Sequence, residues 1–404
     1  MQSYTGSYSS YNCTNPIRKI VENIKVTSNN EDLIVLSYGD PTAYGAVKTP
    51  DSVISSTLDA LKDYKNFSYV NAFGRDDARK AIAEYSSNDR FKPTEKDVII
   101  TSGCSGALEI CILAVANPGE YILLPHPGFS LYEVLAKFSG IKVKYYNLIP
   151  EKDWEADISK MDDLICSKTK AILINNPSNP TSAVYSERHL RELLKFAERH
   201  KLAVISDEVY EHMVFPGNKF ISVSSIDSNV PVLICSGLTK RFLVPGWRLG
   251  WLVICSNNTE MSGLRESLFN LTGRILGSNT LVQAAVPKIL KETDQSFFDE
   301  CMLVFYKNLN IAKNILSDAP GLTLGSSNGA MYLIIKIEIE KFRKFKDDRD
   351  FCQGMLDEVA VFCLPCSAFK YSNWFRLVLT LPHDMMEKAC QRIKKFAQDN
   401  YDRD

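Results

Sequence analysis

The chain has 404 residues, 45% of them hydrophobic, and its formal net charge at pH 7 is −1. This length predicts two or three domains, and the near-neutral charge argues against nucleic acid or an anionic membrane as a partner. No apolar run reaches the ~18 residues of a membrane span, and the polar N-terminus has no secretory signal pattern. Eleven scattered cysteines favour a reducing compartment, so we expect a cytoplasmic protein.

The first part of the chain predicts an N-terminal segment followed by alternating strands and helices. Residues 1–15 are expected to form a flexible arm, and residues 33–37 a strand. Thr49 followed by Pro50 is typical of a helix start and predicts a helix to residue 62, with a second helix at 76–85. Further strands are expected at 98–101, 121–124, 142–146, 171–175, 202–206, 232–235 and 249–255, with helices at 107–116 and 130–139 and from 186.

The strand segments are apolar without alternation, which is typical of strands buried on both faces. Because helices alternate with them, we predict an α/β fold for residues 49–310, with a mostly parallel central sheet and helices on both faces. A long helix from about 298 leads to residues 311–404, where strands at 331–337, 359–364 and 375–381 and helices at 351–359 and 385–400 predict a smaller α+β domain. Cys363 and Cys366 fall in a predicted strand and are interpreted as structural. The five histidines are dispersed, and no metal site is expected.

One lysine lies on a short turn between two predicted strands. Lys240 follows the strand at 232–235 and a run of small residues, and Arg248 comes eight residues later, after Pro-Gly-Trp. A lysine that such a turn holds and partly desolvates becomes a nucleophilic amine, which forms Schiff bases with aldehydes. An arginine nearby can bind a phosphate dianion through its planar guanidinium. Pyridoxal 5′-phosphate (PLP) is an aldehyde that carries a phosphate; the alternative is an exposed lysine and arginine on a solvated loop.

The segment 236–251 resembles the PLP-lysine segment of fold-type I aminotransferases, specifically of the tyrosine aminotransferases. Further stretches match the same family in the same order and span most of the chain. They are Asn-Pro-Ile-Arg at 15–18, Ser-Tyr-Gly-Asp-Pro-Thr at 37–42, Thr-Ser-Gly-Cys-Ser at 101–105, Pro-Gly-Phe-Ser-Leu-Tyr at 127–132, Asn-Asn-Pro-Ser-Asn-Pro at 175–180, Asp-Glu-Val-Tyr at 207–210 and Phe-Arg-Leu at 375–377. The resemblance implies PLP as cofactor, the fold-type I transferase fold, and residues 1–48 joined to the small domain.

Asp207 ends a predicted strand, where ligands of such sheets bind. PLP needs an anion beside its pyridine nitrogen, because the protonated ring is the electron sink; alternatively, this aspartate caps a helix. The resemblance implies that the Tyr210 hydroxyl and the Asn179 side chain bond the 3′-oxygen of PLP, and that Lys240, Asp207 and Tyr210 are catalytic. In the turn after Asn179, Ser182 replaces the family's usual glycine.

The predicted phosphate cradle is the turn of Gly103, Cys104 and Ser105, which joins a strand to a helix. Its small residues let the backbone approach a phosphate at the helix N-terminus. The resemblance assigns Arg248 to the phosphate charge, and Ser236 is a weaker candidate for the same group.

The remaining candidates also come from the resemblance. Phe129 matches the aromatic residue that stacks on the PLP ring, and Arg376 offers the bidentate geometry that recognises a substrate α-carboxylate. The other predicted substrate-binding residues are Gly39, Asn179 and Ile17. Tyr69 matches a tyrosine that reaches the phosphate in the neighbouring subunit, which implies a homodimer with shared active sites. Arg274 is a conceivable partner for a second carboxylate, although a helix-surface arginine is the plainer interpretation.

The sequence therefore predicts a PLP-dependent aminotransferase that moves the amino group of tyrosine, and of other aromatic amino acids, to a 2-oxoacid such as 2-oxoglutarate. The alternatives are an alanine or broad-specificity aminotransferase, a PLP-dependent carbon–sulfur lyase, and a catalytically silent PLP-binding regulatory module. Such a module would normally carry a nucleic-acid-binding domain, for which neither the length nor the charge leaves room.

Overall fold

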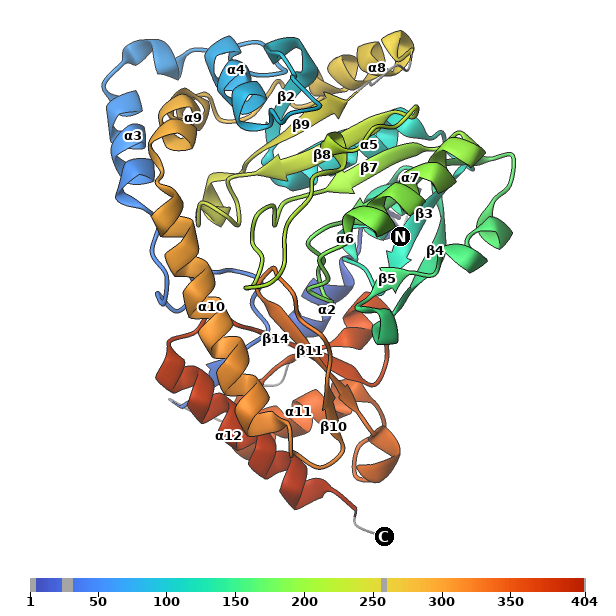
Figure 1. The fold of residues 1–404 in the computed structure, drawn as a ribbon, viewed down its shortest axis with the longest axis vertical. Helices are drawn as coiled ribbons and strands as arrows, with labels where there is room; N and C mark the ends of the chain where they lie inside the picture. Colours follow the sequence, from blue (N-terminus) through green and yellow to red (C-terminus); the bar gives the residue numbers. More distant parts are fainter. Residues whose placement is uncertain (1–4, 24–31, 256–259, 403–404) are drawn as a thin grey trace, which may run out of the picture.

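The structure, a computed structural model, describes residues 5–23, 32–255 and 260–402. A large sheet with helices on both sides lies at one end of the molecule and a smaller sheet at the other, and the long helix α10 (Gln295–Leu316) runs along both (Figure 1). The cavity described below opens between the two sheets.

The large sheet has eight strands in the order β2-β9-β8-β7-β6-β3-β4-β5. Their bounds are β2 Val98–Ser102, β3 Tyr121–His126, β4 Lys142–Ile149, β5 Glu155–Ala156, β6 Thr169–Asn175, β7 Ala203–Asp207, β8 Val232–Gly237 and β9 Leu249–Cys255. The strands from β8 to β4 pair in parallel, whereas β9 is antiparallel to both its neighbours and β5 is antiparallel to β4. The predicted mostly parallel sheet is therefore confirmed.

Both faces of the sheet are buried at β6, β7, β8 and β9, which explains why these strands are mainly apolar, whereas β4 near the edge carries Lys142 and Lys144. Alternate residues of one strand enter two separate apolar layers: Leu173 packs in the layer that contains α5, and Ile172 in the layer that contains α7. The helices around this sheet are α3 (Asp51–Leu61), α4 (Asp76–Tyr85), α5 (Gly103–Val115), α6 (Leu131–Phe138), α7 (Glu187–His200), α8 (Ser262–Thr272) and α9 (Thr280–Glu292).

The smaller sheet is antiparallel, with the order β10-β11-β14-β13, and a separate parallel pair joins β1 to β12. The bounds are β1 Ile34–Val35, β10 Leu322–Leu324, β11 Tyr332–Ile337, β12 Val361–Phe362, β13 Leu364–Pro365 and β14 Trp374–Val378. Helices α11 (Asp348–Val359) and α12 (His383–Asn400) cover this part. The β1–β12 pair links the N-terminal segment to the C-terminal part, which supports the proposed grouping of residues 1–48 with 311–404.

Two predicted helix starts differ from the structure. Helix α5 begins at Gly103, four residues before the predicted start, so the small-residue turn is itself the first turn of the helix. Helix α3 begins without a side-chain cap, because the Thr49 hydroxyl donates to the Leu243 carbonyl oxygen (2.8 Å) instead. Thr49 thus ties this helix start to the loop that follows Lys240. Helices α8 and α9 lie in a stretch for which the sequence predicted no element, and α9 contains Pro287 in its interior.

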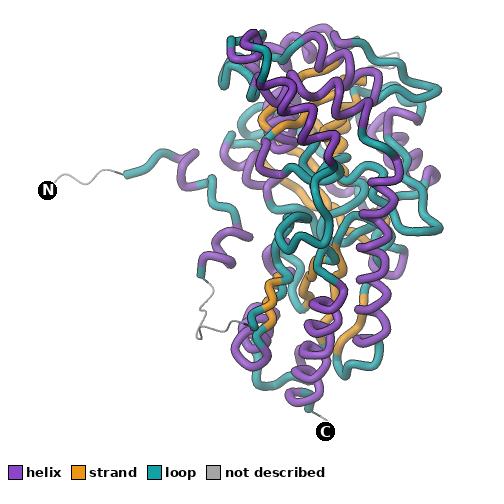
Figure 2. Tube along the Cα trace, turned by 90° about the vertical axis from the view of Figure 1, so that its left-hand side faces the viewer, coloured by secondary structure: helices purple, strands orange, loops and turns teal. Residues whose placement is uncertain are grey.

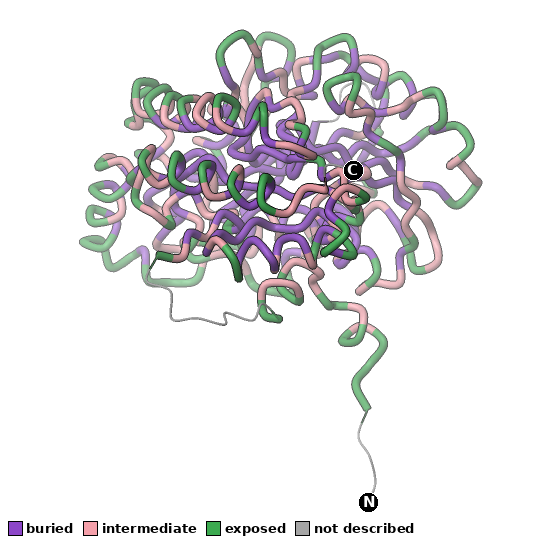
Figure 3. Tube along the Cα trace, turned by 90° about the horizontal axis from the view of Figure 1, so that it is seen from below, coloured by how far each residue is buried: buried purple, intermediate pink, exposed green. Residues whose placement is uncertain are grey.

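The described part of the predicted flexible arm, residues 5–15, contains the short helix α1 (Tyr8–Tyr11), and a second short helix, α2 (Pro16–Glu22), follows it. The N-terminal segment projects from the rest of the molecule (Figure 2), and its described residues are largely exposed (Figure 3). Asn15 caps α2 by accepting from the Ile17 amide (3.0 Å). Within the described ranges, no helix has the length and apolar character needed to cross a membrane.

Candidate active site

A cavity of about 440 Å³ lies at the carboxyl ends of β6, β7 and β8. Residues predicted from the sequence that line it are Ile17, Gly39, Cys104, Ser105, Phe129, Asn179, Asp207, Tyr210, Lys240, Arg248 and Arg376. Gly103, Ser236 and Tyr69 do not line it, and Tyr132 and Tyr332 line it without having been predicted. The structure therefore brings most of the predicted residues to one place, the edge of a parallel sheet at which ligands bind.

Asp207 is a buried carboxylate at the end of β7, with 3% of the residue exposed. Its Oδ2 accepts from the Tyr132 hydroxyl (2.6 Å), and its Oδ1 accepts from the Val209 amide (3.2 Å) and the Cys104 thiol (3.5 Å). Burial raises the pKa of Asp207, and these hydrogen bonds only partly oppose that shift. A cationic ligand group beside Asp207 would therefore stabilise its charged form.

Tyr210 and Asn179 present polar groups on the same side of the cavity. The Tyr210 hydroxyl is 2.7 Å from the hydroxyl of Tyr332, and burial raises the pKa of Tyr210, so that the phenol is neutral at pH 7. Asn179 accepts from Arg376 Nη1 through its side-chain oxygen (2.7 Å), which leaves its amide nitrogen as a donor for a ligand. Ser182 has a φ of 58°, the left-handed conformation that usually requires glycine, and its hydroxyl donates to the Tyr332 carbonyl oxygen (2.8 Å).

Lys240 lies on the turn that follows β8, as the sequence predicted. Its Nζ donates to the Gly39 carbonyl oxygen, so a residue of the N-terminal segment holds the amine. Lys240 is also a source of the positive potential that lowers the pKa of Asp207 against the effect of burial. The amine and the buried carboxylate thus face one ligand volume.

A polar network of Arg241, Tyr85 and Glu211, which we call the rear network because these residues do not line the cavity, holds the turn that carries Lys240. The guanidinium of Arg241 lies 4.0 Å from the ring centroid of Phe298, and its Nη1 donates to the Tyr85 hydroxyl (2.5 Å). Tyr85 in turn donates to Glu211 Oε1 (2.9 Å), the residue after Tyr210. The network therefore joins the lysine turn to the turn that carries Asp207 and Tyr210.

Ser236 belongs to that rear network, which corrects its predicted role in phosphate binding. Its hydroxyl donates to Glu211 Oε1 (3.0 Å). The preceding residue, Cys235, packs in the layer of α5, with its sulfur 3.5 Å from that of Cys111. Because side chains alternate along a strand, Ser236 must point to the opposite face, away from the N-terminus of α5.

The predicted phosphate cradle is formed by the first turn of α5 and by Arg248. No side chain caps this helix, so its first amide groups remain available to an anion. Arg248 Nη2 donates to the Ser105 hydroxyl (3.0 Å) and lies directly over Gly103, where a Cβ atom would collide with the guanidinium. Gly103 also has a φ of 72°. Gly103 does not line the cavity, but it allows the Arg248 guanidinium to approach the N-terminus of α5. The positive charge of Arg248 and the amide groups of this helix end together fit a phosphate.

Arg376, on β14, is a second arginine in the lining of the cavity. It is 3% exposed, and its Nη1 and Nη2 donate to Asn179 Oδ1 and to the Ser37 carbonyl oxygen (3.0 Å). The guanidinium carbon lies 4.2 Å from the ring centroid of Tyr332 and 5.2 Å from that of Phe369. Its Nε has no partner in the part of the chain that the structure describes. An almost fully buried arginine with an unused donor fits a carboxylate ligand.

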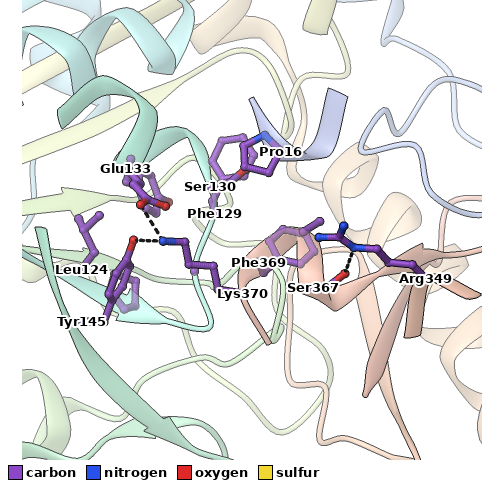
Figure 4. Close-up of a pocket in the computed structure, with 14 residues that line it drawn as sticks. Pro16, Leu124, Phe129, Ser130, Glu133, Tyr145, Arg349, Ser367, Phe369 and Lys370 are labelled. Atoms are coloured by element: carbon purple, nitrogen blue, oxygen red, sulfur yellow. Dashed lines mark hydrogen bonds and ion pairs between the residues drawn. The ribbon is translucent and has the colours of Figure 1, made fainter. Parts of the chain in front are cut away.

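Phe129 and Tyr132 line both the main cavity and a smaller neighbouring one of about 240 Å³. Figure 4 shows this smaller cavity between the large sheet and the Lys370 turn, with Pro16 of α2 on one side. Lys370 Nζ donates to Glu133 Oε1 (2.7 Å) and to the Tyr145 hydroxyl (2.8 Å). These contacts join the C-terminal part to the large sheet at the smaller cavity.

The N-terminal helix α2 supplies a further wall of the main cavity through Ile17 and Arg18. By contrast, Arg274 lies outside the cavity and pairs with Glu109 (3.1 Å), so the structure assigns it to the surface and not to a substrate carboxylate. Tyr69 is 91% exposed, and its predicted role toward a neighbouring subunit stays a prediction. Cys363 and Cys366 are buried, and burial raises the pKa of both thiols, as expected of structural cysteines.

Comparison with known proteins relates this arrangement to one family. The model of the family "aminotransferase class I and II" matches residues 31–393. The chain is 44% identical to the tyrosine aminotransferase of Mus musculus over 389 residues, which cover 96% of this chain and 86% of that protein. The crystal structure of tyrosine aminotransferase from Leishmania infantum matches with a TM-score of 0.95 at 29% identity, covering 99% of this chain and all of that one. The structure of alanine aminotransferase from Pyrococcus furiosus matches with a TM-score of 0.90 at 30% identity, covering 98% and 100%.

Proposed function

Because this chain belongs to the class I and II aminotransferases, we propose that it transfers the amino group of L-tyrosine, and of other aromatic amino acids, to a 2-oxoacid such as 2-oxoglutarate. One observation carries the proposal: a single cavity is lined by an amine, Lys240, a buried carboxylate, Asp207, and two arginines, Arg248 and Arg376. The relatives named tyrosine aminotransferase support tyrosine as the amino donor.

The residues present fit PLP, the cofactor of this family. The uncapped start of α5 with Ser105 and Arg248 would hold the phosphate, and Phe129 would pack against the ring. Tyr210 and Asn179 would donate to the 3′-oxygen, since both have donor capacity facing the cavity. When bound, PLP supplies an electron-withdrawing pyridine ring that stabilises negative charge at the substrate α-carbon.

Asp207 would keep the pyridine nitrogen protonated. Burial raises the pKa of Asp207 and so disfavours its charge, and a pyridinium beside it would oppose that shift. The hydroxyl of Tyr132 and the amide of Val209 hold the carboxylate in place. These groups therefore orient an anion that would otherwise be costly to bury.

Lys240 would move the proton. As a free amine, its Nζ would take the proton from the substrate α-carbon, and as an ammonium it would give a proton back, acting as base and then as acid. The rear network of Arg241, Tyr85 and Glu211 fixes the position of the Lys240 turn relative to the turn that carries Tyr210. Proton transfer is sensitive to such positioning at the scale of about 1 Å.

Arg376 would bind the α-carboxylate of both the amino donor and the acceptor. Asn179 and the Ser37 carbonyl oxygen hold its guanidinium, and two aromatic rings lie against it. Ile17 would provide apolar contact for the aromatic ring of the substrate. Because one substrate at a time occupies this site, the two half-reactions should alternate and the kinetics should be ping-pong.

We further propose a homodimer with shared active sites in the cytoplasm. Helix α3 and the turn after it expose an apolar surface, made of Ile54, Leu58, Leu61, Tyr64, Phe67 and Tyr69. Exposed apolar patches of this kind mark protein interfaces, and the patch ends at the tyrosine predicted to reach the neighbouring phosphate. The eleven cysteines are present as thiols, which supports a reducing compartment.

A substrate panel tests the proposed activity. The purified protein with PLP is assayed for kcat/KM with tyrosine, phenylalanine, tryptophan, methionine, alanine and aspartate, each with 2-oxoglutarate. We expect tyrosine to be preferred. Alanine or aspartate exceeding tyrosine by about tenfold, which is ~1.4 kcal/mol of transition-state preference, would refute the aromatic assignment. Release of ammonia in place of transfer to the oxoacid would indicate a lyase.

A further inference from the structure

A buried tyrosine that no motif singled out lies between the two halves of the site. Tyr332 is 1% exposed, its hydroxyl is 2.7 Å from that of Tyr210, and its ring lies against the guanidinium of Arg376. We infer that Tyr332 is a positioning residue with two separable roles: its hydroxyl directs the Tyr210 proton to the cofactor, and its ring orients Arg376 for the substrate carboxylate. This inference rests on the proposed function.

The hydroxyl role follows from counting donors and acceptors. Either phenol could donate in this pair, but Tyr210 is the partner of the Tyr332 hydroxyl among the residues that the structure describes. If Tyr210 donated to Tyr332, its proton could not also reach the 3′-oxygen to which the proposed function directs it. If Tyr332 donates, the Tyr210 proton remains for an oxygen in the cavity. A hydroxyl that accepts one hydrogen bond also becomes a stronger donor in the next.

The ring role follows from the register of the small sheet. Tyr332 on β11 is paired with Val378 on β14, and Arg376 lies two residues before Val378. The side chains of Tyr332 and Arg376 therefore share one face as diagonal neighbours. The ring centroid is 4.2 Å from the guanidinium carbon, close enough for a cation–π contact.

Two serine hydroxyls hold the backbone of Tyr332, one from the loop after β6 and one from the loop between β10 and β11. Its carbonyl oxygen accepts from the hydroxyls of Ser182 and Ser327, both at 2.8 Å. Ser182 lies in the same turn as Asn179, which itself accepts from Arg376. Tyr332 is thus fixed at its backbone, its ring and its hydroxyl, and each attachment leads to a different part of the site.

Three variants separate these roles. Tyr332→Phe removes only the hydroxyl, and Tyr332→Leu also removes the ring. Tyr146→Phe is the matched control, because Tyr146 is equally buried and its hydroxyl donates to the Leu173 carbonyl oxygen (2.8 Å), outside the cavity. For each holoenzyme we would measure the pH midpoint of the cofactor's visible absorbance change and the Kd of 3-phenylpropionate, an unreactive carboxylate, by calorimetry.

Tyr332→Phe should raise the absorbance midpoint by about half a pH unit, because a weaker Tyr210 donor stabilises the anionic cofactor oxygen less. Its Kd for 3-phenylpropionate should stay within about twofold of wild type, whereas Tyr332→Leu should weaken that Kd about tenfold. Tyr146→Phe should change neither value.

An unchanged or lowered midpoint in Tyr332→Phe would refute the hydroxyl role, and unchanged carboxylate binding in Tyr332→Leu would refute the ring role. Should Tyr332→Leu fail to fold, Tyr332→Ile and Tyr332→Met take its place for the same binding measurement. Failure of the proposed function is distinguishable, because then the wild-type protein would lack the cofactor absorbance and borohydride would not fix PLP to Lys240.

Discussion

Asp207→Asn should yield a folded protein that binds PLP but has lost most of its transaminase activity. The asparagine oxygen can still accept from the Val209 amide, and its NH2 group can donate to the Tyr132 hydroxyl oxygen, so the shape of the site is kept while the charge is removed. Asp207 is 3% exposed, so its pair with a pyridinium would be fully shielded from water. Removing one partner of a buried ion pair costs about 3–5 kcal/mol. At ~1.4 kcal/mol per tenfold, kcat/KM should fall about 10²- to 10⁴-fold.

The same variant should have the opposite effect on the cofactor-free protein. Burial raises the pKa of Asp207 in the folded state above its unfolded value. The stabilising contribution of such a group is present below the unfolded pKa and is lost as the pH rises through the folded pKa. At pH 7, above the unfolded pKa, Asp207 therefore makes the apoprotein less stable than a neutral side chain of the same shape would, and Asp207→Asn should raise its melting temperature. With PLP bound, wild type should be the more stable of the two.

Two measurements check this reasoning: kcat/KM with tyrosine and 2-oxoglutarate, and calorimetric melting with and without PLP. Glu208→Gln is the matched control, since Glu208 is a buried carboxylate in the next position that accepts from Ser206 and the Val223 amide and does not line the cavity. It should keep kcat/KM within a few-fold of wild type. A near-wild-type rate in Asp207→Asn, or an equal loss in the control, would refute the electrostatic role.

Three further predictions test the lysine, the phosphate cradle and the dimer. Lys240→Ala should abolish transamination without unfolding the protein; PLP trapped by borohydride on another lysine would contradict the assignment. Gly103→Ala should weaken PLP retention at least about tenfold, because its φ of 72° and the overlying Arg248 leave no room for a Cβ, whereas the exposed Gly45→Ala, also at positive φ, should not; dialysis followed by absorbance measures both. Mixing Tyr69→Phe with Lys240→Ala should restore activity in hybrid dimers, and verified hybrids without activity would argue against shared sites.

The sequence predicted many of the residues that line the cavity, because they follow directly after the carboxyl ends of apolar strands. Asn175, Asp207 and Gly237 end three parallel strands of the large sheet, and the loops that follow carry the predicted residues. The face to which a side chain points is harder to predict, because it depends on strand register. Asp207 is paired with Cys235, so both face α5 and Ser236 faces away. A shift of one residue in that register would have exchanged their roles.

Tyr332 escaped prediction for a different reason. It lies in an apolar strand segment, Tyr332–Ile337, in which the sequence pattern predicts only that Tyr332 is a core residue. Its ring contacts Arg376 only after β11 and β14, which are far apart in the sequence, have paired. Its hydroxyl contacts Tyr210 only after the small sheet has packed against the part of the chain that carries the large one. Local patterns carry no information on such a contact. A buried phenol does require a hydrogen-bond partner, and that requirement is the one signal that could have drawn attention to it.

Ser182 shows how a departure from the family's pattern can be accommodated at this junction. A side chain at a φ of 58° costs about 1 kcal/mol relative to glycine, so serine is unfavourable there on local grounds. Its hydroxyl, however, donates to the Tyr332 carbonyl oxygen, a bond that glycine cannot make. A net hydrogen bond contributes about the same energy, which offsets the strain. The turn keeps the geometry that glycine would adopt, and in this chain it also binds directly to the strand that carries Tyr332.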